Sequence, residues 1–286
     1  LSDEIVGMWV CNDGLTDGIT IMSYSDNGKM TITTAAALGT NDPLVKRESD
    51  YVVVGDLMFT KLPAVNVEGQ LMYTAARMTY TPNGTSAGDI MTHKKYIPSG
   101  NGLKESVMSF LRIKQTLNLP NQKYNYIKTY VSNVKGEDKD IDFMGYTFNF
   151  AKMDGSGLDK MLKSLLFAVE FPDANTLGYS YQMNGNKETY NSPIVVEGNK
   201  MTIKMSAKVP TLKDVVLYAF QDADCSQMHF YMHKTAFVSF YTNMQAMLMA
   251  ATNEQFDITN AEAVNAIYDN INNAVETINV SLVMSK

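Results

Sequence analysis

The sequence has few of the residues that carry the commonest chemistries. Its 286 residues include only two cysteines, three histidines and one tryptophan. Cys11 and Cys225 lie far apart, so no disulfide framework is predicted. No apolar run approaches the ~18 residues of a membrane helix, so no transmembrane segment is expected. There is also no glycine-rich phosphate loop, H-E-x-x-H pair or C-x-x-C motif, and therefore no cofactor is expected.

Positive charge is also scarce. The net charge is −6, the pI is about 5.1, and the arginines are only Arg47, Arg77 and Arg112. A nucleic-acid-binding protein needs a basic stripe that displaces counterions from phosphates, and we expect no such partner here. The opening "LSDEIVGMWV" has neither a basic start nor an apolar signal core, so any secretion signal would precede this numbering.

Most of the chain alternates apolar and polar residues, as strands with one buried face do. In "KMTIKM" (200–205) the methionines and the isoleucine fall on one side, and lysines and threonine on the other. "SDNGKM" (25–30) joins two such runs through Asn27-Gly28, which tolerate the positive φ of hairpin turns. Short strands at this spacing favour a barrel or sandwich over βαβ units.

One phrase occurs twice: "VGDLMFTK" (54–61) and "EGNKMTIK" (197–204) share a glycine, a methionine and a lysine at the same spacing. Two segments also carry apolar residues at helical spacing, "PNQKYNYIKTYVSNVKG" (120–136) and "TNAEAVNAIYDNINNA" (259–274). In the second, Thr259 and Glu262 form a predicted capping box. The apolar faces are Ile127, Tyr130, Val131 and Val134, and Val264, Ile267, Tyr268 and Ile271.

These matches predict a duplicated β-module, with chance similarity between strand-rich segments as the alternative. The expected domains are residues 1–153 and 154–286, joined through the glycine-rich "KMDGSGLDK" (152–160). Each is expected to be a closed antiparallel β-barrel with a helix before its last strand, because closure removes aggregation-prone edges.

Gly7-Met8-Trp9 on the first predicted strand, with hairpins and a late helix after it, resembles the lipocalin and calycin barrels. The second half, through "LKDVVLYAFQDADCSQMHFYM" (212–232) and "AVETINVSLVMSK" (274–286), looks like the lipocalin-like lipoproteins secreted by Bacteroides-type gut bacteria. The resemblance implies a periplasmic or outer-membrane, cell-surface lipoprotein, with its lipid anchor upstream of residue 1. The lipocalin pattern also has an arginine from the last strand stacked over the tryptophan. The expected last strands, "IDFMGYTFNF" and "TINVSLVM", contain no arginine.

Three groups of residues invite a catalytic or metal-binding interpretation. Gly84–Gly88 matches G-x-S-x-G, with Ser86 as a hydrolase nucleophile and Asp89 and His93 close behind it, but a strand rather than a helix is predicted to follow. His229 and His233 would lie roughly 13 Å apart along a strand, too far for one tetrahedral ion. The acids of "EDKDIDF" (137–143) lack the glycine and glutamate of a calcium loop. We therefore expect neither enzymatic activity nor a metal site, with a serine hydrolase as a remote alternative.

Twenty methionines recur on the presumed inner faces, and methionine suits both irregular cores and permissive apolar pockets. The favoured hypothesis is a non-enzymatic protein that binds a small hydrophobic or amphipathic molecule inside a barrel, more favourably the second. The alternative is a cell-surface interaction or glycan-binding scaffold with filled barrels. The candidate cavity residues are Phe167, Phe171, Tyr179, Tyr181, Met201, Met205, Met228, Phe230, Met232 and Met284.

Overall fold

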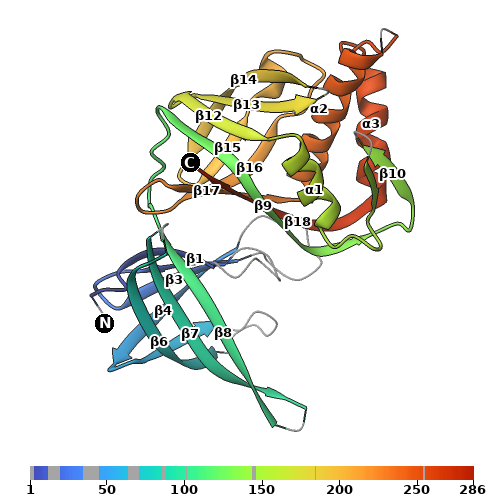
Figure 1. The fold of residues 1–286 in the computed structure, drawn as a ribbon. Helices are drawn as coiled ribbons and strands as arrows, with labels where there is room; N and C mark the ends of the chain where they lie inside the picture. Colours follow the sequence, from blue (N-terminus) through green and yellow to red (C-terminus); the bar gives the residue numbers. More distant parts are fainter. Residues whose placement is uncertain are drawn as a thin grey trace. The chain divides into compact units, whose positions relative to one another are not determined.

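The computed structural model describes residues 3–11, 20–34, 45–63, 71–85, 88–100, 102–143, 146–183, 185–253 and 255–286. The protein is mainly β and contains two closed eight-stranded antiparallel barrels (Figure 1). The chain divides into two compact units, one around each barrel. The fold class predicted from the alternating pattern is confirmed.

The first barrel is built from consecutive strands that pair with their sequence neighbours, and β1 closes it against β8. Its buried core contains five methionines, Met22, Met30, Met58, Met78 and Met91, among aromatic and aliphatic residues. The strands are β1 (Gly7–Cys11), β2 (Thr20–Tyr24), β3 (Lys29–Thr34), β4 (Val45–Val54), β5 (Leu57–Pro63), β6 (Leu71–Thr85), β7 (Gly88–Ser99) and β8 (Gly102–Ile113).

The second barrel has the order β12-β13-β14-β15-β16-β17-β18-β9, so its first and last strands in the chain close it. A small hairpin, β10 (Asp140–Phe143) and β11 (Tyr146–Asn149), and helix α1 (Ser156–Ser164) separate β9 from β12. The barrel strands are β9 (Gln122–Gly136), β12 (Ala168–Asp173), β13 (Thr176–Met183), β14 (Asn186–Glu197), β15 (Lys200–Ile203), β16 (Val215–Gln221), β17 (Gln227–His233) and β18 (Val275–Ser285).

All the helices of this unit lie in connections at the same end of the second barrel (Figure 1). The short 3₁₀ helix η1 (Met205–Ala207) follows β15, and α2 (Lys234–Thr252) and α3 (Ala261–Ala274) lie between β17 and β18. Among the described residues, the opposite end has the turns β12–β13, β14–β15 and β16–β17 and the segment that leads into β9. In the first barrel the last two strands, β7 and β8, are joined by a turn at Gly100. The helix expected before the last strand of each barrel therefore precedes β18 in the second barrel but does not precede β8 in the first.

The prediction of a helix over 120–136 is wrong, because this segment is the fifteen-residue strand β9. Its pairing with β18 shifts register at three places, and these irregularities break the period of two. Ile127, assigned to the apolar helix face, is 48% exposed. Because β9 belongs to the second barrel, the chain passes from the first barrel to the second between Ile113 and Gln122. The predicted boundary at 153/154 falls after the first strand of the second barrel.

The helix predicted over 259–274 is confirmed as α3, with Val264 and Ile271 fully buried. Its cap differs from the predicted box. The side chain of Asn260 accepts hydrogen bonds from the backbone N–H groups of Glu262 (3.0 Å) and Ala263 (3.3 Å). Thr259 instead donates its hydroxyl to Asp257 at 2.7 Å. Asparagine is as good an N-cap as serine, and it lies one residue later.

The repeated phrase occupies the same place in both barrels, the turn between the fourth and fifth strands. Gly55 and Gly198 each have φ of 64° at the first position of a two-residue turn, which favours glycine. The residue after each glycine accepts a hydrogen bond at its carbonyl from a backbone N–H of the neighbouring strand. Met78 donates to Asp56 at 2.7 Å, and Ala219 donates to Asn199 at 2.8 Å. The two barrels therefore share this hairpin in detail.

Candidate functional site

The inner face of the second barrel holds all ten residues predicted to surround a ligand. Each is buried, and all belong to one hydrophobic core together with residues of α1, α2 and α3. Five of them line a cavity inside the barrel, and the other five pack elsewhere in the core. The cavity-lining residues among the ten are Phe167, Tyr179, Met205, Phe230 and Met232.

The cavity has a volume of about 50 Å³ and almost entirely apolar walls. A water molecule needs roughly 10–15 Å³ on this measure and two or more polar partners, so such a space favours an apolar guest over water. The strand walls are completed by Val169, Leu177, Ile203, Val215, Leu217 and Leu282. Helix α2 closes the remaining side with Phe240, Asn243, Met244 and Met247.

Asn243 is the only polar side chain other than the Tyr179 hydroxyl group in this lining, and its polar atoms are occupied. Its Nδ2 donates to the carbonyl of Lys213 at 2.7 Å, and its Oδ1 accepts from the N–H of Lys213 at 2.9 Å. The amide therefore ties α2 to the connection between β15 and β16. Sequence reasoning missed α2 as the closing element, although its run of apolar residues on all sides is typical of a buried helix.

A groove with a volume of about 510 Å³ lies next to the cavity, at the end of the barrel where the helices gather. Tyr179, Met205 and Met247 line both spaces and so form the wall between them. The wall has weak polar contacts only. The hydroxyl of Tyr179 donates to Met247 Sδ at 3.5 Å, and the hydroxyl of Ser192 donates to Met205 Sδ at 3.1 Å.

Two lining residues of this groove, Tyr179 and Tyr190, belong to a stack of three tyrosines. Tyr190 lies between Tyr179 and Tyr181, with ring centroids 5.5 Å and 5.9 Å apart and near-parallel planes. Burial raises the pKa of Tyr179 and of Tyr181 well above the ordinary value of 10. Both phenols therefore remain protonated at neutral pH and act as hydrogen-bond donors.

In the first barrel an arginine is stacked over the single tryptophan. Arg112 Cζ lies 4.2 Å from the centre of the Trp9 ring, and its Nε donates to Asp89 at 3.0 Å. Its remaining nitrogens donate to the carbonyls of Val6 (2.8 Å) and Glu4. A Cβ on Gly7 would lie 2.9 Å from Arg112, so glycine makes room for the guanidinium.

This arrangement corrects the expectation that the last strands lack an arginine. The last strand of the first barrel is β8, "GLKESVMSFLRI", and Arg112 pairs across the sheet with Trp9. The arginine was missed because the segment after the mistaken helix at 120–136 was taken as the closing strand.

The residues of the hydrolase interpretation are engaged elsewhere or lie outside the described residues. Ser86 itself is outside them, and β7 begins at Gly88 as a strand, as predicted. Asp89 is held by Arg112 and by the hydroxyl of Tyr80 at 3.0 Å. His93 lies inside the barrel, 3.5 Å from the hydroxyl of Tyr24, and burial lowers its pKa to about 4. His93 is therefore neutral at physiological pH.

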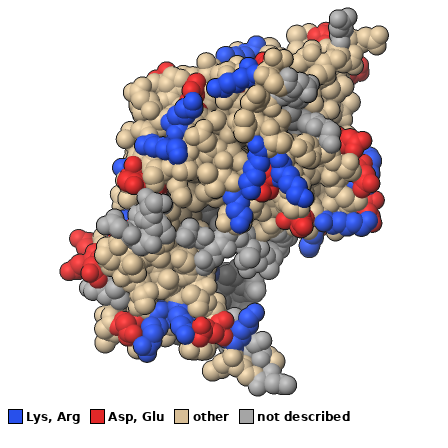
Figure 2. Space-filling view, in the orientation of Figure 1, with Lys and Arg blue, Asp and Glu red and all other residues tan. Residues whose placement is uncertain are grey.

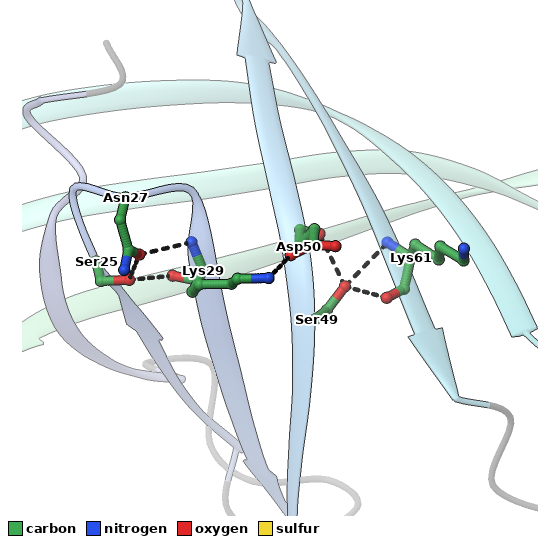
Figure 3. Close-up of polar contacts among 6 residues, drawn as sticks. All are labelled: Ser25, Asn27, Lys29, Ser49, Asp50 and Lys61. Carbon is green, nitrogen blue, oxygen red and sulfur yellow. Dashed lines mark hydrogen bonds and ion pairs between the residues drawn. The ribbon is translucent and has the colours of Figure 1, made fainter.

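A second groove, of about 580 Å³, lies on the wall of the first barrel beside β3, β4 and β5. Its polar groups bind one another (Figure 3). Asn27 accepts from the hydroxyl of Ser25 at 2.6 Å, and Lys29 pairs with Asp50. The hydroxyl of Ser49 accepts from the N–H of Lys61 at 3.0 Å, where β4 stops pairing with β5. These contacts stabilise the sheet and make this groove the weaker candidate.

The remaining polar candidates do not converge on a site. His229 and His233 both lie on β17, as predicted; burial lowers the pKa of His229 to about 4, and His233 is the last residue of the strand and the N-cap of α2. Asp138 and Asp140 both accept from Asn149, at 2.8 Å and 2.9 Å. Within the described ranges, no group of three or more histidine, cysteine or acidic side chains is placed to hold a metal ion.

The charged side chains of the face drawn in Figure 2 are of mixed sign, with lysines and arginines beside acids. The ion pairs of the described residues include Lys94–Glu105 at 2.7 Å and Arg77–Asp56 at 2.9 Å. No helix in the described part of the chain is both long and apolar enough to cross a membrane.

No family model, curated protein or solved structure shows significant similarity to the chain.

Proposed function

We propose that the second barrel binds a small hydrophobic or amphipathic molecule and that the protein has no enzymatic activity. The observation that carries this proposal is the apolar cavity lined by the strands and α2. A guest there would be stabilised by roughly 25 cal/mol for each Å² of apolar surface that it buries. The methionines in the wall are flexible, so the cavity can enlarge toward the groove by changes of side-chain rotamer.

The direct test is saturable binding of a neutral naphthylamine dye, whose fluorescence rises in apolar surroundings. Leu217→Phe places a larger side chain in the cavity and should abolish the rise in fluorescence. The matched control is Leu162→Phe, which changes a buried leucine of the same core away from the cavity. Overpacking costs about 1–3 kcal/mol in either variant, so circular dichroism should first establish that both are folded.

Equal dye binding by the two variants, or no saturable binding by the unmodified protein, would contradict the proposal. A protein that binds no apolar dye but still binds glycans or another protein would instead be the filled-barrel scaffold. Mass spectrometry of denatured protein gives an independent check, since a molecule bound during expression should be released with it.

We also propose a lipocalin-like, lipid-anchored protein of the periplasm or outer-membrane surface. The stack of Arg112 on Trp9 beside Gly7 supports this kinship, because it is the arrangement that the Gly-x-Trp resemblance implies. The anchor and the location depend on the resemblance alone. Metabolic labelling of the natural protein with a fatty acid, followed by membrane fractionation, tests both, and an unlabelled protein in the soluble fraction would contradict them.

A further inference from the structure

The groove beside the cavity has an uneven distribution of charge. Its lining combines apolar side chains with the neutral polar groups of Thr189, Asn191 and Ser192 and with one charged residue, Lys208. No aspartate or glutamate is among the lining residues. Lys208 is exposed and forms no ion pair among the residues that the structure describes.

Lys208 is close in the chain to the wall between groove and cavity. Helix η1 begins at Met205, a wall residue, and Lys208 follows three residues later as its C-cap. In a 3₁₀ helix the side chains at i and i+3 lie on the same side. The backbone agrees with this geometry, because the N–H of Lys208 donates to the carbonyl of Met205 at 3.2 Å. The cation therefore lies at the groove side of a movable apolar wall.

We infer that the ligand is a single-chain anionic amphiphile, a carboxylate at the end of a linear hydrocarbon chain. This inference rests on the proposed function and specifies its ligand. The chain passes between Met205 and Met247 into the cavity, while the carboxylate stays in the groove near Lys208. The cavity lining has no charged side chain, and its two polar groups, the Tyr179 hydroxyl and the Asn243 amide, already form hydrogen bonds, so a carboxylate buried there would have no countercharge. The head group is therefore excluded from the barrel and left beside the lysine.

The test compares dodecanoate with dodecanol in displacing the naphthylamine dye. The two probes have the same chain length and differ in the charged head. The unmodified protein should bind dodecanoate about three- to fivefold more tightly than dodecanol, the range expected for an exposed ion pair. Lys208→Met should remove this preference and leave dodecanol binding unchanged. Lys187→Met, an exposed lysine of the same barrel outside the groove, should retain it.

Equal binding of the two probes, or an equal loss of both in Lys208→Met, would overturn the anionic head group while the proposed function stands. Failure of dodecanol, dodecanoate and dye alike to bind would overturn both.

The route is tested separately by Ala251→Trp, which obstructs the groove at an exposed position of α2 and should weaken dodecanoate binding at least about tenfold. Ala266→Trp, exposed on α3 outside this groove, is the matched control. Unchanged affinity in Ala251→Trp would refute the route.

Discussion

Replacing Arg112 by methionine should destabilise the first barrel, because its guanidinium joins β8, β1 and the chain before β1. The variant loses the stack on Trp9, the pair with Asp89 and the hydrogen bonds to the carbonyls of Val6 and Glu4. A cation–π contact contributes about 0.5–2 kcal/mol and a hydrogen bond to a charged group about 1.5–3 kcal/mol. Because the Arg112 side chain is 21% exposed, water replaces part of these contacts.

We therefore expect the free energy of unfolding of the first barrel to fall by about 2–3 kcal/mol. The assay is urea denaturation followed by tryptophan fluorescence. Trp9 is the only tryptophan in the chain and is fully buried beside Arg112, so its emission reports the first barrel. The methionine variant retains an apolar stem over the ring, which limits the loss of packing itself.

The matched control is Arg77→Met. Arg77 pairs with Asp56 at 2.9 Å, but both side chains are more than half exposed, and such a pair contributes at most about 1 kcal/mol. The reasoning is refuted if Arg112→Met and Arg77→Met shift the fluorescence midpoint by the same amount. Arg112→Lys should fall between them, because a lysine retains the charge but lacks the planar fork that reaches several acceptors.

Three further outcomes are expected. The pKa of His93 falls from 6.5 to about 4 on folding, so the unfolded state binds more protons between these values. Stability of the first barrel should decrease by up to about 1.4 kcal/mol per pH unit as the pH falls from 6.5 to 4, and His93→Gln should flatten this dependence of the Trp9 midpoint. Gly55→Ala and Gly198→Ala should each lower the free energy of unfolding by about 1 kcal/mol through the positive φ alone, since nothing lies within 4 Å of the added Cβ. A neutral effect in thermal denaturation would be inconsistent with the turn geometry. Asn243→Ala should destabilise the second barrel by about 2 kcal/mol through its two lost hydrogen bonds, measured by near-ultraviolet circular dichroism with the Trp9 midpoint as an unaffected control.

The strands and hairpins were predictable because local turn chemistry determines them. The glycine at the start of each repeated turn is required by its backbone angle, and this requirement can be inferred from the sequence. The segment 120–136 was misread for a physical reason. Each register shift in β9 moves its later side chains relative to the sheet faces, so apolar residues at 127, 130, 131 and 134 imitate a helical period. Its content of tyrosine and β-branched residues was the signal for a strand.

The candidate site was predictable only in its composition. Alternation correctly assigns the aromatic and methionine side chains of β13 and β17 to an interior. It does not show that the alternate residues of these strands, such as Ser180 and Tyr231, are buried as well. Whether the interior is open depends on how far α2 enters it, and this depends on long-range packing. Likewise, the groove requires η1 and α2 to meet from positions about forty residues apart, which no local pattern encodes.

The way each barrel closes also has a consequence for synthesis on the ribosome. The seam of the first barrel joins β1 to β8, so that barrel can form as soon as Ile113 has left the exit tunnel. The seam of the second joins β9 to β18, and β18 is translated after all the other strands of that barrel. Until then β9 has an exposed edge with unsatisfied backbone groups, which a neighbouring nascent chain or a chaperone can contact.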